Sequence, residues 1–95
     1  MRWPIIIRRT VGRSMKPTLL PNSLVLATGL YRRIAKDDLV IFEHSGIDKI
    51  KRVKDIGNDR VYVLGDNDQE STDSRVFGWI PSSSIKAKVI WPRKR

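Results

Sequence analysis

The 95-residue chain contains no cysteine. Disulfide bonds, thiolate metal sites and thiol nucleophiles are therefore excluded as sources of stability or chemistry. Histidine is nearly absent too, because His44 is the only one, and its place beside a turn glycine predicts a surface position rather than a ligand or a base. Any proton transfer would therefore have to rely on other side chains.

Long apolar runs are also missing. The longest apolar stretch near the amino end, residues 3–7, is far shorter than the roughly 20 residues that a helix needs to cross a bilayer. Arginines follow this stretch directly, which is not the pattern of a secretory signal. We expect a cytoplasmic protein if the natural chain has no anchor, and a membrane-associated one if an anchor is missing from this sequence.

Acidic residues are few, since 10 Asp and Glu stand against 19 Lys and Arg, which gives a net charge of +9. A positive field of this kind attracts nucleic acid, anionic lipid or an acidic protein, and charge alone does not choose among them. Helix-turn-helix features are absent and the aromatic residues are not spaced as a base-stacking platform, so no nucleic-acid partner is expected. The length and the 40% hydrophobic content indicate one domain over residues 1–95.

Short segments rich in β-branched residues and separated by turn residues predict an all-β fold. The expected strands cover residues 5–11, 24–27, 39–42, 47–56, 61–64 and 85–91, with a short helical turn over 81–84. The run 39–42 is apolar throughout, which is typical of a strand buried on both faces. We expect one coiled antiparallel sheet or a partly open barrel.

Three motifs carry the chemistry. Ser14 lies within Gly12-Arg13-Ser14-Met15-Lys16-Pro17-Thr18-Leu19, and Lys51-Arg52-Val53 follows on an expected strand. The third motif is Gly65-Asp66-Asn67, Ser71, Asp73-Ser74-Arg75 and Phe77-Gly78. A serine hydroxyl needs an adjacent base, and a lysine can serve when burial lowers its pKa. Strand alternation does not decide whether Lys51 or Lys49 points inward, and a charged, solvated strand beside a capped surface loop remains the alternative interpretation.

In this order the motifs resemble the signal peptidase I family of serine proteases, which use a Ser/Lys dyad, over nearly the whole chain from Thr10 to Trp91. The short soluble branch that includes nickel-type superoxide dismutase maturation proteases is the most similar. The resemblance implies the signal peptidase and LexA-like fold, with no cofactor and no metal. It also implies Ser14 as nucleophile, Lys51 as general base, Ser71 as the residue that orients the lysine amine, and an ion pair between Asp73 and Arg75.

The resemblance further implies a peptide substrate bound as an extended strand, by strand addition. The expected substrate-binding residues are Thr10, Val11, Gly12, Met15, Asp48, Lys49 and Ile50. The backbone N–H of Ser14 should donate to the oxyanion of the tetrahedral intermediate. Some family members add a serine hydroxyl two residues before the nucleophile, but this chain has Gly12 there.

The first functional hypothesis is a serine endopeptidase that removes an amino-terminal extension from a precursor protein, with nickel-type superoxide dismutase as the narrower expectation. A second is the catalytic domain of a general signal peptidase without its anchor, in which Trp3 and residues 5–7 contact the lipid surface. A third, of another class, is a basic nucleic-acid-binding or repressor-type module.

Overall fold

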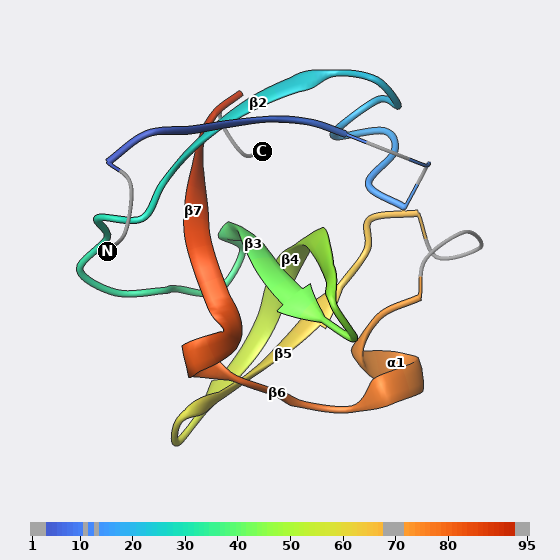
Figure 1. The fold of residues 1–95 in the computed structure, drawn as a ribbon. Coiled ribbons are helices and arrows are strands. Elements are labelled where there is room, and N and C mark those ends of the chain that lie inside the picture. The colour runs from blue at the N-terminus through green and yellow to red at the C-terminus, as the bar shows by residue number, and fades with distance from the viewer. Residues whose placement is uncertain (1–3, 11, 13, 68–71, 93–95) are drawn as a thin grey trace.

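The computed structural model of the chain describes residues 4–10, 12, 14–67 and 72–92 (Figure 1). Seven strands form a single antiparallel sheet in the order β1-β2-β7-β3-β4-β5-β6. Their bounds are β1 Ile6–Arg9, β2 Leu24–Thr28, β3 Leu39–His44, β4 Ile47–Gly57, β5 Arg60–Leu64, β6 Ile80–Pro81 and β7 Ile85–Trp91. One short helix, α1 Ser74–Phe77, and a 3-10 turn over Ser82–Ser84 complete the described part.

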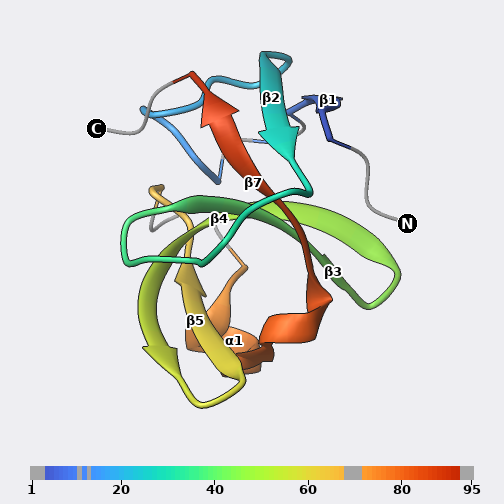
Figure 2. The same cartoon turned by 90° about the vertical axis from the view of Figure 1, so that its left-hand side faces the viewer.

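The strand that comes last in the sequence lies inside the sheet. β7 pairs with β2 on one side and with β3 on the other, so it joins the amino-terminal strands to the β3–β4–β5 meander. The sheet coils strongly but does not close, because β1 and β6 stand at opposite ends of the strand order (Figure 2). The prediction of an all-β fold with one coiled, partly open sheet is confirmed.

Tight turns fix the register of the β3–β4 and β4–β5 hairpins. Ser45 and Gly46 have φ of 53° and 77°, and Asp59 has φ of 57°. These left-handed angles match the right-handed twist of the flanking strands, and Gly, Asn and Asp tolerate them best. The sequence predicted both turns from these residue types.

The core lies on both faces of β3, whose first four residues are all buried. Val40 and Phe42 belong to the largest buried cluster, together with side chains of β4, β5, β6 and β7. Leu39 packs on the other side with the turn that follows β1, and Ile41 packs with β2 and β7. The prediction that this apolar run is buried on both faces is confirmed.

Two local features differ from expectation. The first strand, Ile6–Arg9, is shorter than residues 5–11. Thr10 follows it and joins the next turn, because its N–H donates to the Ser23 carbonyl at 2.8 Å and its hydroxyl donates to the Leu20 carbonyl at 2.6 Å. The segment expected as a loop up to residue 75 ends in α1, whose N-cap is Asp73. Four residues carry too little periodicity to indicate a helix.

Candidate active site

Ser14 lies in the turn that connects β1 to β2 and is half-buried. The next residue, Met15, is buried with Leu19, Val25 and Leu39, and the Leu19 N–H donates to the Met15 carbonyl at 2.8 Å to close one helical turn. Burial of these apolar side chains fixes the backbone beside Ser14. The motif therefore holds a polar side chain at the surface by placing its neighbours in the core.

The turn that carries Ser14 is tied to the other two motifs by hydrogen bonds. The Asn67 N–H donates to the Ser14 carbonyl at 2.8 Å. The Asp66 carboxylate accepts from the Thr18 hydroxyl at 2.5 Å and from two nitrogens of Arg52, at 2.9 Å and 2.8 Å. One half-buried carboxylate thus connects the serine turn with the strand that carries Lys51.

Charge is well compensated at this junction. Burial alone would raise the pKa of Asp66, but the hydrogen bonds from Arg52 and Thr18, together with the positive charge of Arg52, hold that pKa below its ordinary value. Asp66 therefore stays ionised at neutral pH, and the bidentate geometry is the strongest form of such a pair.

Lys51 is the buried lysine of β4, with 4% of its surface exposed. It pairs with Val40, and because directly paired residues share a face of the sheet, its stem lies on the side of the largest apolar cluster. Burial lowers the pKa of Lys51 below its ordinary value; Asp73 opposes this shift, while the charges of Lys49 and Arg75 add to it. Strand alternation did not decide whether Lys49 or Lys51 points inward. The burial of Lys51 shows that its side chain points inward.

Lys49 has a different environment. Its side chain is half-buried, and its Nζ lies 5.1 Å from the centroid of the Phe77 ring. His44, expected at the surface, is also half-buried, with its ring stacked on Phe77 at 4.1 Å between centroids and its Nδ1 buried without a hydrogen-bond partner among the described residues. His44 is thus less exposed than a simple surface position would be, because the ring of Phe77 from α1, which was not predicted, covers it.

A cleft of about 450 Å³ contains both Ser14 and Lys51 in its lining. Six of the expected substrate-binding residues line the same cleft, namely Thr10, Gly12, Met15, Asp48, Lys49 and Ile50. Val11, the seventh, lies outside the described residues. The further lining residues are Arg8, Arg9, Leu19, Ile41, Ile47 and Thr72.

Two strand edges border this cleft. β1 is at one end of the strand order. β4 pairs with β5 only from Arg52 onward, so within the described chain residues 47–51 pair on one edge only, with β3. Free edges of this kind are where an extended peptide can add as a strand.

The loop that follows β5 is held by Asp73, which is fully buried. Its carboxylate accepts from the Gly65 N–H at 2.8 Å and forms the expected ion pair with Arg75 at 2.6 Å. The ion pair is therefore confirmed. Ser71, expected to orient the Lys51 amine, lies outside the described residues, and its role stays a prediction.

The family comparison matches residues 45–93, just over half of the chain, to the model described as "Signal peptidase, peptidase S26". The chain belongs to this peptidase family. The matched part of this S26 member includes Lys51 and the Asp73–Arg75 loop, whereas Ser14 precedes it. The comparison with curated proteins gave no match.

No helix in the described part of this S26 member is long and apolar enough to cross a membrane.

The sequence did not indicate the junction of Thr18, Arg52 and Asp66, although each residue belongs to a motif that was singled out. Their chain separations of 14 to 48 residues explain this, because no local pattern reports which polar side chains meet after folding. The one sequence signal that could have indicated this junction was that Arg52 directly follows Lys51. If Lys51 points into the core, its neighbour must point to the other face and needs a partner there.

Proposed function

We propose that the chain is a serine endopeptidase in which Ser14 is the nucleophile and Lys51 the general base. The observation that carries this proposal is a cleft lined by a half-buried serine and by a buried lysine whose pKa is lowered. The lysine is suited to the role because an uncharged amine can accept the hydroxyl proton, which an arginine could not do.

In the proposed reaction the Ser14 oxygen attacks the carbonyl carbon of the scissile peptide bond while its proton passes to the amine of Lys51. The backbone N–H of Ser14 donates to the resulting oxyanion. The protonated Lys51 then gives its proton to the leaving amine, and an acyl-enzyme ester remains on Ser14. Water, deprotonated by Lys51, attacks the ester and restores the free serine.

The proposed substrate is an amino-terminal extension of a precursor protein, bound as a strand between the β1 and β4 edges. The two free strand edges that border the cleft support an extended chain rather than a compact ligand. Membership of the S26 family supports this substrate class. The narrower proposal, from the resemblance of the motifs, is the propeptide of a nickel-type superoxide dismutase.

The test is cleavage of fluorogenic precursor peptides by the purified protein. Ser14→Ala and Lys51→Ala should each lower kcat by at least about 10³-fold, the scale seen when one member of such a unit is removed. The rate of the wild type should rise with pH through an apparent pKa below the ordinary 10.5 of lysine. Lys54→Ala, an exposed site on the same strand, is the control and should be close to wild type. Undiminished cleavage by the Ser14 or Lys51 variant would refute the mechanism.

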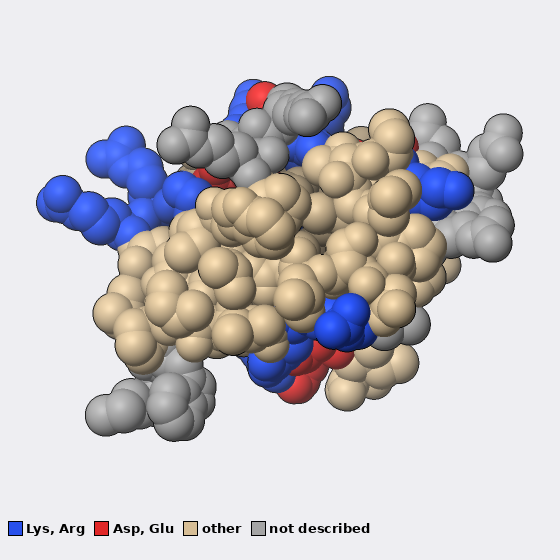
Figure 3. Space-filling view, turned by 90° about the horizontal axis from the view of Figure 1, so that it is seen from above, with Lys and Arg blue, Asp and Glu red and all other residues tan. Residues whose placement is uncertain are grey.

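A second candidate is a general signal peptidase that works against a lipid surface. The observation in its favour is a row of apolar side chains across the outer face of β1, β2 and β7, where Ile7 pairs with Leu26 and Leu26 with Trp91. Ile7 and Trp91 are 60% and 55% exposed. Seen from above, this side of the molecule is a broad area free of charge, with lysines and arginines at its margins (Figure 3).

A further inference from the structure

The walls of the cleft carry more positive charge than the proposed chemistry needs. Arg8 and Arg9 of β1 and Lys49 of β4 line it together with Ser14 and Lys51. Since Lys51 is the group that must lose its proton, the remaining cations have no role in the transfer itself. Their positive charges in the lining should therefore influence which peptides the cleft binds.

No carboxylate of the described residues neutralises these three cations. Among the described residues, Arg8 donates only to the Ile7 carbonyl at 3.1 Å, and Arg9 only to the carbonyl and side-chain oxygens of Asn22. The Lys49 amine has the Phe77 ring as its neighbour. Within the described chain none of the three has a carboxylate within ion-pair distance.

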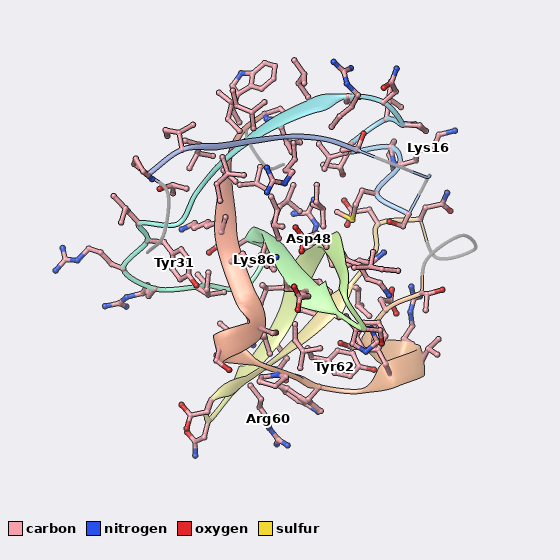
Figure 4. All side chains as sticks on the ribbon, in the orientation of Figure 1. Lys16, Tyr31, Asp48, Arg60, Tyr62 and Lys86 are labelled. Carbon is pink, nitrogen blue, oxygen red and sulfur yellow. The ribbon has the colours of Figure 1, made fainter. Side chains whose placement is uncertain are left out.

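The one acidic residue in the described lining is already paired. Asp48 accepts a hydrogen bond from the Lys86 Nζ at 2.8 Å, and Lys86 also lies 3.3 Å from a Glu43 oxygen (Figure 4). The partner cation comes from β7, outside the lining. Among the described lining residues, three cations besides Lys51 therefore stand against one acidic residue that is already paired.

We propose that the cleft selects precursor peptides that carry an acidic residue on the side of Arg8. This inference rests on the proposed function. Clefts with low-dielectric walls concentrate the field of the charges that line them, so a carboxylate is attracted and a basic side chain is repelled. Arg8 shares its face of β1 with Ile6, which packs on the core, and the arginine therefore lies on the inner side of the strand.

The acidic residue should lie some distance from the scissile bond. A substrate carboxylate close to Lys49 would also lie close to Lys51, whose pKa responds to nearby charges. It would raise the pKa of Lys51 and so keep this proposed base protonated. Arg8 is six positions before Ser14 in the chain. Since a peptide bound as a strand advances about 3.3 Å per residue, moving the acidic residue along the substrate locates the position that reaches Arg8.

The experiment uses fluorescent peptides with alanines around the scissile bond and a single Glu or Gln moved along each side. Binding is measured by anisotropy with Ser14→Ala, which separates affinity from cleavage. We expect the Glu peptide to bind about two- to fivefold more tightly than the Gln peptide at one or two positions, as one solvent-accessible ion pair provides. The preference should shrink as salt is raised, because screening acts on exposed pairs.

Arg8→Gln in the Ser14→Ala background should abolish the preference, and Arg8→Glu should transfer it to a Lys peptide. Arg33→Gln, an exposed site outside the described lining, is the matched control and should leave the preference unchanged. Equal binding of the Glu and Gln peptides at every position, or an equal effect of the control, overturns the inference. Cleavage by the wild type without discrimination counts against this inference alone, whereas discrimination in binding without cleavage counts against the proposed function alone.

Discussion

Among single residues, Lys51 carries a cost in stability that follows from its burial. The pKa of Lys51 in the folded chain is lower than its ordinary value of 10.5. At a pH between the folded and the unfolded pKa, the amine of Lys51 therefore holds a proton in the unfolded chain but not in the folded chain. The free energy of unfolding of the wild type therefore rises with pH across this window. Below the window the folded chain buries the charged amine, and the cost is present in full.

Lys51→Met should for this reason stabilise the protein while abolishing its activity. We expect the free energy of unfolding to increase by about 1 kcal/mol near neutral pH, the size usual for a stabilising change at a functional site. The gain should shrink as the pH approaches 10.5, where the wild-type amine is neutral in both states. Urea unfolding at pH 7 and pH 10 measures it, with Lys54→Met as the exposed control. A variant less stable than wild type at both pH values would contradict the burial argument.

The sequence alone suggested which residues to propose as nucleophile and base, whereas it did not reveal their environments. Ser14 and Lys51 stand in motifs whose residue types already indicate a nucleophile and a base, and the structure places both in one cleft. The burial of Lys51, by contrast, follows from its pairing with Val40 and from the cluster beneath it. Alternation along the strand gave no preference, since neither face of β4 is purely apolar.

At the level of elements, the serine turn and β4 depend on each other through Asp66. Asp66→Asn would leave the half-buried Arg52 guanidinium without its anionic partner and should lower the free energy of unfolding by about 1 to 3 kcal/mol. The wild type should lose the same contribution as the pH falls through the lowered pKa of Asp66, so the two proteins should converge in acid. Urea unfolding between pH 3 and pH 7 provides the measurement.

Thr18→Val is the companion variant, because it removes one hydrogen bond to Asp66 and keeps the Arg52 pair. It should cost less than Asp66→Asn and keep most of the acid sensitivity. Equal losses for both variants, or a loss from Asp66→Asn that does not vary with pH, would mean that the ion pair is not the source of the stability.

Among the elements, strands with strong patterns were predicted closely and short ones were missed. The expected range 85–91 is β7 itself, and the apolar run 39–42 forms most of β3. α1 and β6 have four and two residues, which is too short for a periodic signal, and they form because Asp73 caps the helix and β5 offers an edge. Tertiary contacts decide such segments.

For the molecule as a whole, the apolar outer face of β1, β2 and β7 predicts reversible binding to anionic vesicles. The apolar side chains supply burial in the interface, and the net charge of +9 supplies attraction to acidic headgroups. Flotation with phosphatidylcholine vesicles, with and without phosphatidylglycerol, should show binding only when the anionic lipid is present.

Ile7→Asp and Trp91→Asp should each weaken that binding, while Val76→Asp should not, because Val76 is more exposed than either but belongs to α1 on the far side of the molecule. If the Ile7 and Trp91 variants bind vesicles as well as the wild type does, the surface that contacts the lipid is not the outer face of β1, β2 and β7. No binding to either kind of vesicle would remove the membrane version of the function and leave the peptidase chemistry untouched. Circular dichroism of each variant checks that the sheet is retained.

The position of β7 between β2 and β3 has a consequence for synthesis of the chain. While residues 85–91 are still inside the ribosome, the amino-terminal strands have no strand of the sheet that joins them to the β3–β4–β5 meander. Contacts of the serine turn then connect the two parts, through Leu19 with Leu39 and Thr18 with Asp66. The cleft between them should therefore reach its full stability late, when the strand over residues 85–91 emerges and joins the sheet.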